Sequence, residues 1–108
     1  MTTFDDRERS FEKKFGQDQE LQFKVNARKN KLLGLWAAGL LGKSGEAADA
    51  YAKEVVVSDF EKAGDDDVIG KVTNDLVAAG KAFDAATVRK HANGLMDEAK
   101  KQLMSELK

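Results

Sequence analysis

The tripeptide Gly42-Lys43-Ser44 is the first candidate for chemistry, because it resembles the end of a loop that binds nucleotide phosphates. Such a loop also requires a glycine five residues before Gly42 and a preceding β-strand. Position 37 is alanine, and the residues around it follow the pattern of a helix. The simpler explanation is a turn between two helices, in which Ser44 caps the second helix.

A basic stripe, formed by Lys24, Arg28 and Lys31, is the second candidate. Spacings of four and three residues bring these side chains to one face of a helix, where they could contact phosphate or an acidic partner. A solvated helix face is the simpler explanation. The functional alternative is a small nucleotide-binding sensor that binds ADP or ATP weakly and uses no other cofactor. Its candidate residues are Lys24, Arg28, Lys31, Lys43 and Ser44.

Catalytic and metal-binding residues are not predicted in this chain. His91 is the single histidine and has no partners at metal-ligand spacing, and cysteine is absent. The acidic run from Asp65 to Asp67 could hold Mg²⁺ or act as acid and base, but its place after Gly64 is typical of the first turn of a helix. We therefore expect no catalytic residues, no metal site, and a protein that is not an enzyme.

Three phenylalanines near the N-terminus are the most informative feature. Phe4, Phe11 and Phe15 are seven and four residues apart, so they lie along one side of a helix whose other positions are mostly charged. Because so short a helix is marginal in water, we expect residues 1–17 to form a mobile amphipathic segment that orders when its phenylalanines are covered. Either the chain's own bundle covers them, as a hydrophobic flap would allow, or another protein does.

Composition limits the remaining function classes. The chain has 108 residues, 42% of them hydrophobic, which suits one small domain. Its 18 basic and 19 acidic residues give a net charge of −1, which argues against nucleic-acid binding. No apolar run reaches the roughly 20 residues that a membrane-spanning helix needs, and the N-terminus lacks the pattern of a signal peptide. We expect a cytoplasmic protein that does not insert into the membrane and is a monomer when free.

Helical spacing of apolar residues, absent proline and separating glycines predict an all-α fold. Short connections between successive helices favour a compact four-helix bundle over residues 18–108, preceded by the N-terminal segment, residues 1–17. The predicted helices run from Asp18 to Leu41, from Glu46 to Lys62, from Asp65 to about Gly80, and onward from a cap at Asp84 or Thr87.

The apolar faces of these helices define the predicted core. In the first helix, Leu32, Leu35 and Trp36 belong to the central stripe, and Phe23 and Leu33 broaden it. Gly34 and Gly39 are predicted to allow close approach of a neighbouring helix. The other predicted core positions include Leu21, Val25, Tyr51, Val55, Phe60, Val68, Val72, Leu76, Val77, Val88 and Leu103.

Three stretches of the sequence together resemble a known family. They are Thr3 to Glu12 (TFDDRERSFE), Arg28 to Ala38 (RKNKLLGLWAA) and Ala47 to Val56 (AADAYAKEVV). The chain is similar over essentially its whole length to the ζ-subunit family of alphaproteobacteria. Members of this family are four-helix proteins that inhibit the F1 part of ATP synthase.

The resemblance implies a partner and a mechanism. The N-terminal segment would insert as a helix between a catalytic β subunit and the neighbouring α subunit of F1, near the γ rotor, and block ATP hydrolysis. The phenylalanines would anchor it, and its charged side chains would set its register through ion pairs. The protein would then be peripheral to the inner membrane through F1Fo-ATP synthase. The implicated residues are Phe4, Asp5, Arg7, Glu8, Arg9, Phe11, Glu12 and Phe15.

Overall fold

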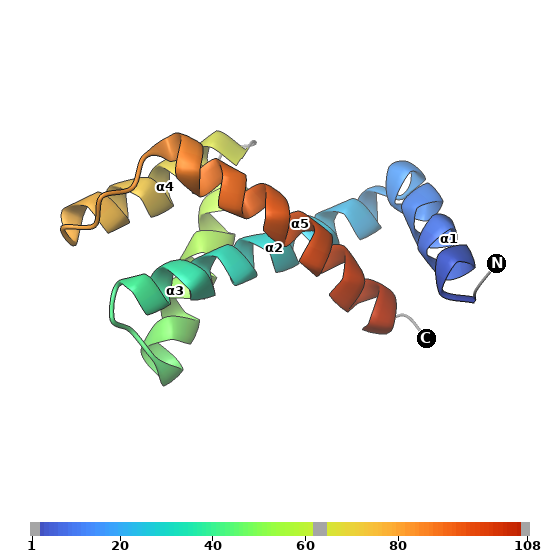
Figure 1. The fold of residues 1–108 in the computed structure, drawn as a ribbon, viewed down its shortest axis with the longest axis horizontal. Helices are drawn as coiled ribbons and strands as arrows, with labels where there is room; N and C mark the ends of the chain where they lie inside the picture. The colour runs from blue at the N-terminus through green and yellow to red at the C-terminus, as the bar shows by residue number, and fades with distance from the viewer. Residues whose placement is uncertain (1–2, 62–64, 107–108) are drawn as a thin grey trace.

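The computed structural model describes residues 3–61 and 65–106, with side chains for residues 9–58 and 67–106, and these residues are all helical apart from short connections (Figure 1). The all-α fold class is therefore confirmed. Helix α2 is central and contacts the other four helices, while α2 to α5 form the bundle. The helices are α1 (Thr3–Gln17), α2 (Gln19–Leu40), α3 (Gly45–Glu61), α4 (Asp65–Ala78) and α5 (Ala85–Glu106).

The ends of the helices follow the predicted capping residues. The Asp18 carboxylate accepts hydrogen bonds from the backbone N–H groups of Glu20 and Leu21, which confirms it as the N-cap of α2. Asp84 accepts one from the backbone N–H of Thr87 at 2.8 Å, so Asp84 rather than Thr87 caps α5. Gly42 and Gly80 follow α2 and α4 with φ angles of 78° and 82°, a backbone conformation that glycine adopts without strain.

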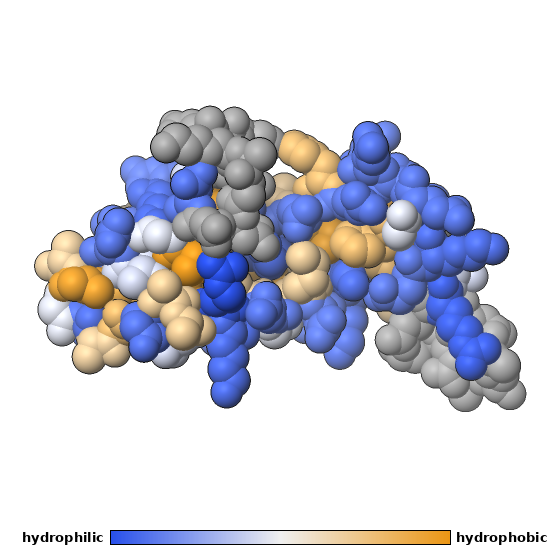
Figure 2. Space-filling model, turned by 90° about the horizontal axis from the view of Figure 1, so that it is seen from above, coloured by the Kyte–Doolittle hydropathy of each residue, from blue (hydrophilic) through white to orange (hydrophobic). Residues whose placement is uncertain are grey.

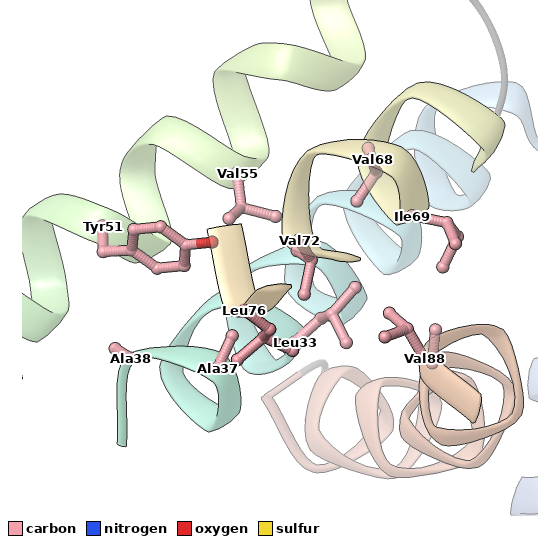
Figure 3. Close-up of a cluster of buried hydrophobic side chains, with 11 residues drawn as sticks. Leu33, Ala37, Ala38, Tyr51, Val55, Val68, Ile69, Val72, Leu76 and Val88 are labelled. Carbon is pink, nitrogen blue, oxygen red and sulfur yellow. The ribbon is translucent and has the colours of Figure 1, made fainter. Parts of the chain in front are cut away.

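The larger core lies where four helices of the bundle meet. Figure 3 shows Leu33 of α2, Val55 of α3, Val72 of α4 and Val88 of α5 pointing toward one another, and all four are fully buried. Trp36 packs at the edge of this cluster. Burial of a branched side chain of this size contributes about 1.5 to 3 kcal/mol, so this cluster is the main source of stability for the bundle.

A second, smaller core joins α1 to the bundle. Phe11 is 6% exposed and packs with Val25 of α2 and with Ala99 and Leu103 of α5. Figure 1 shows α1 beside the C-terminal half of α5, at the end of the molecule opposite the α4–α5 connection. The N-terminal segment is therefore a helix packed on the bundle here, as the flap alternative predicted, and its mobility stays a prediction.

Gly34 allows a close approach between α2 and α3. A Cβ atom at Gly34 of α2 would lie 2.6 Å from the Cα atom of Ala52 in α3, closer than such atoms come in proteins. The prediction for Gly34 is confirmed. The matching prediction for Gly39 is wrong, because a Cβ there would meet nothing within 4 Å and the residue is exposed beyond the contact with α3.

Some predicted core positions lie at the surface instead. Phe23 is 54% exposed, because α3 crosses α2 at Gly34, about 16 Å further along the helix at 1.5 Å per residue. Val77 is 56% exposed beside the fully buried Leu76, since the apolar face of α4 is narrower than predicted. Leu33 and Ala37 are fully buried, whereas Trp36 is half-buried, so the centre of the α2 face lies one position away from the predicted stripe. The predicted core residue Phe60 lies outside the described side chains.

Candidate protein-binding segment

Helix α1 presents its apolar side to the bundle and its charged side to solvent. Phe11 is buried and Phe15 is half-buried, whereas Arg9 and Glu12 are exposed. The structure thus brings Phe11 and Phe15 to one side of a helix, as the spacing predicted. Of the other residues implicated in partner binding, the side chains of Phe4, Asp5, Arg7 and Glu8 lie outside the described residues.

Lys100 of α5 makes two contacts with α1 that were not predicted from the sequence. Its Nζ atom lies 3.3 Å from Oε2 of Glu12 and 4.4 Å from the centre of the Phe15 ring. The Lys100 side chain is only 20% exposed, so water screens these contacts less than it would at an open surface. One lysine therefore holds two side chains that lie one helical turn apart on α1.

The junction between α1 and α2 is a single residue, Asp18. Its backbone N–H donates to the carbonyl of Lys14 at 2.8 Å, while its carboxylate caps α2. Nε2 of Gln22 donates to the carbonyl of Phe15 at 2.7 Å, which satisfies one of the free carbonyl groups at the end of α1. These bonds set the angle at which α1 leaves the bundle.

The structure separates the residues proposed for nucleotide binding. Lys24 forms an exposed ion pair with Glu20 at 3.4 Å. Arg28 forms an ion pair with a residue of α5. Lys43 and Ser44 are exposed beyond the C-terminal end of α2, which lies about 24 Å from Lys24 at 1.5 Å per residue. Lys31 is exposed in the middle of α2. The hollows beside Lys71, beside Lys100 and beside Trp36 are lined by none of these candidates.

Arg28 fixes the end of α5 against α2. Its guanidinium donates to Oε1 of Gln102 at 2.8 Å and to both carboxylate oxygens of Glu106 at 2.8 and 3.0 Å. Both bonds to Glu106 come from the same nitrogen, Nη2, and bonds between ionised groups are stronger than those between neutral groups. The pairing spans 78 residues of sequence, so local spacing could not reveal it. Arg28 thereby shapes the part of the bundle on which α1 packs.

An aromatic cluster holds His91 in a structural contact. The His91 ring stacks on the sole tryptophan, Trp36, with ring centres 4.0 Å apart, and Phe83 meets Trp36 edge-on at 5.6 Å. Within residues 9–58 and 67–106, whose side chains are described, no group of three metal-binding side chains is found. Asp67 is half-buried at the start of α4, and the side chains of Asp65 and Asp66 lie outside the described residues.

A polar network that the sequence did not predict lies between α3 and α4. The Tyr51 hydroxyl donates to Oδ2 of Asp75 at 2.8 Å, and Lys71 lies 3.2 Å from the same oxygen and 3.8 Å from Glu54. Burial, the hydrogen bond to Asp75 and the negative charges of Asp75 and Glu54 raise the pKa of Tyr51 well above its usual range. The hydroxyl therefore stays protonated and structural at neutral pH.

The face of the molecule shown in Figure 2 is mostly hydrophilic. Figure 2 shows hydrophobic areas gathered at the end that holds the α4–α5 connection, where Val77 is exposed, with smaller areas elsewhere on this face. Of the helices in the described part of the chain, none combines the length and the apolar character needed to cross a membrane.

Comparison with known proteins shows to which family the chain belongs. A protein whose structure was solved by NMR in solution is 55% identical to this chain, with a TM-score of 0.70; the match covers 81% of this chain and 99% of that one. No match was found among curated proteins. The sequence model described as ATPase inhibitor subunit zeta matches residues 1–102, which include α1 and nearly all of the bundle. This chain therefore belongs to the ATPase inhibitor subunit zeta family.

Proposed function

We propose that α1 is the part of this chain that enters the F1 part of ATP synthase and blocks ATP hydrolysis. Membership of the family supports an inhibitory role and an interaction with F1. In the proposed mechanism, α1 inserts at the interface between a catalytic β subunit and the neighbouring α subunit, close to the γ rotor. The protein then acts as a regulator and not as an enzyme.

The observation that carries this proposal is that α1 is attached to the bundle through contacts separate from the larger core. Its described contacts with the bundle come from one apolar side, centred on Phe11, from Lys100, and from the hydrogen bond of Gln22 at the junction. Among the described side chains of α1, residues 9–17, none belongs to the larger core around Leu33. Helix α1 can therefore leave the bundle without opening the cluster that stabilises α2 to α5, and its aromatic side can then be buried elsewhere.

The residues of α1 suit an interface between protein subunits. Phe11 and Phe15 supply aromatic anchors, a residue type that contributes much of the affinity when it fills a pocket. Exposed Arg9 and Glu12 offer charges of both signs, which select a complementary surface and fix register. Phe4, Asp5, Arg7 and Glu8 extend the same pattern in the sequence toward the N-terminus.

The proposal is tested by ATP hydrolysis of the cognate F1 complex. Full-length protein should inhibit, whereas residues 18–108 alone and the double variant Phe11→Ala/Phe15→Ala should require at least about tenfold more protein, the effect of losing roughly 1.4 kcal/mol of binding. The matched control is Lys13→Ala/Lys14→Ala, which changes two exposed residues of α1 outside the proposed anchors. Full inhibition by residues 18–108 would reject α1 as the inhibitory part.

A further inference from the structure

The contacts of α1 with the bundle use the same aromatic side that the proposed inhibition requires. Phe11 lies in the cluster with Val25, Ala99 and Leu103, and is 6% exposed. Phe15 is half-buried below the Lys100 ammonium group. An α1 helix docked in this way cannot offer these two rings to another protein at the same time.

Lys100 has the geometry of a latch for α1. Its Nζ atom lies between the Glu12 carboxylate, at 3.3 Å, and the face of the Phe15 ring, at 4.4 Å. An ion pair and a cation–π contact both require the positive charge, so removing that charge weakens both contacts together. Lys100 belongs to α5 and lies outside the N-terminal segment, so this contact can be removed without altering α1.

The surface of the bundle on which α1 docks is held in place by contacts that do not involve Lys100. Arg28 ties the last turns of α5 to α2 through Gln102 and Glu106, and Ala99 and Leu103 of α5 face Val25 of α2 in the smaller core. Loss of the Lys100 contact therefore leaves both walls of the docking surface in place. Its effect should be confined to the position of α1.

The edge of the contact between α1 and α5 is a hollow that is partly open to solvent and lined mostly by charged side chains. A hollow of about 290 Å³ remains between α1 and α5. Helix α1 is joined to the bundle through Asp18, with Glu12 half-exposed at the edge of the contact. The hollow is lined by Phe11, Glu12, Asp97, Lys100, Lys101 and Met104.

From these contacts we infer that docking of α1 on its own bundle is an autoinhibited state of the inhibitor, held by Lys100. The inference rests on the proposed function, since it concerns the regulation of the same segment. Release of α1 must precede its binding to F1, and the apparent affinity and rate of inhibition are reduced in proportion to the released fraction. The bundle thus sets how readily the chain inhibits.

The test compares full-length Lys100→Gln with wild-type protein in two measurements. Hydrogen exchange of the backbone amides of residues 9–17 should be faster in the variant, and inhibition of the cognate F1 complex should begin about threefold faster, the order expected for a partly screened contact. Lys90→Gln is the matched control, because it removes an exposed charge from the other half of α5. Lys100→Arg keeps the charge and should behave as wild type.

Unchanged exchange of α1 in Lys100→Gln, or faster exchange without faster onset of inhibition, would overturn the latch. Exchange of the α3 and α4 amides should be the same in all four proteins, which shows that the bundle is intact. If neither wild type nor Lys100→Gln inhibits F1, the proposed function itself fails. If both inhibit at the same rate, the proposed function stands and the latch alone is rejected.

Discussion

Gly34 of α2 and Ala52 of α3 form a close contact between helices, with no room for a side chain at position 34. A Cβ atom added to Gly34 would lie 2.6 Å from the Cα atom of Ala52, and 3.2 Å from a methyl group of Val55. The first obstacle is backbone, which cannot move without shifting a whole helix. The separation of α2 and α3, and with it the larger core, therefore depends on this glycine.

Gly34→Ala should destabilise the bundle, although alanine favours a helix by about 1 kcal/mol over glycine. Overpacking of this kind costs about 1 to 3 kcal/mol, so we expect a net fall in the free energy of unfolding, measured by urea denaturation with circular dichroism. Gly94→Ala is the control, because a Cβ at Gly94 in α5 meets nothing within 4 Å. That variant should gain up to about 1 kcal/mol. Equal gains in both variants would contradict the close contact.

Tyr51→Phe should lower the free energy of unfolding by about 1 to 2 kcal/mol at pH 7, because it removes a buried hydrogen bond to a charged group, Asp75. The raised pKa of Tyr51 adds a pH dependence. A group whose pKa is higher in the folded state contributes fully below its unfolded pKa of about 10, and this contribution is lost as the pH rises further. The difference in stability between wild type and variant, measured by urea denaturation, should therefore shrink above pH 10. A constant difference would contradict a raised pKa.

Asp84→Asn should reduce the sensitivity of the protein to acid. Hydrogen bonds from the side chain and backbone of Thr87 hold the pKa of Asp84 below its usual range. A group whose pKa is lower in the folded state contributes stability at pH values above its unfolded pKa, near 3.9. This contribution is lost as the pH falls through the folded pKa. Asparagine keeps a capping oxygen without titrating, so the melting temperature of the variant should fall less between pH 5 and pH 2. Asp84→Ala, the control, should lower the melting temperature across the whole range.

Asn30→Leu should stabilise the protein by about 1 kcal/mol. Asn30 is fully buried in α2, and its side-chain amide has no hydrogen-bond partner in the part of the chain that the structure describes. A buried amide without partners costs about 1 to 3 kcal/mol, and an apolar side chain of similar size removes that cost. Asn93→Leu, at an exposed site on α5, should change the free energy of unfolding by less than about 0.5 kcal/mol. A loss of stability in Asn30→Leu would show that the amide is satisfied in solution.

Local features of the fold could be predicted from the sequence because their causes are local. Asp18 and Asp84 accept hydrogen bonds from residues two or three positions away, and Gly42 and Gly80 adopt positive φ angles directly after the helices they follow. Each depends on a few neighbouring residues. The family resemblance, carried by three short stretches, was equally readable and is confirmed.

Contacts between distant parts of the chain could not be predicted from spacing. Glu12 and Lys100 are 88 residues apart, and nothing in the periodicity of α5 distinguishes Lys100 from its neighbours. Phe23 has the right type and spacing for a core residue, but its burial depends on where α3 crosses α2. The sequence therefore indicated which side of α1 must be buried. The residues that bury it could be identified only from the packing of α1 on α2 and α5.

The position of Trp36 decides what an optical experiment can observe. It is the sole tryptophan, and it lies with His91 and Phe83 at the edge of the larger core, which contains none of the described side chains of α1. Intrinsic tryptophan fluorescence will therefore follow the unfolding of the bundle and remain constant when α1 leaves its docking surface. A chain that appears fully native by this measurement can already have its N-terminal helix free in solution.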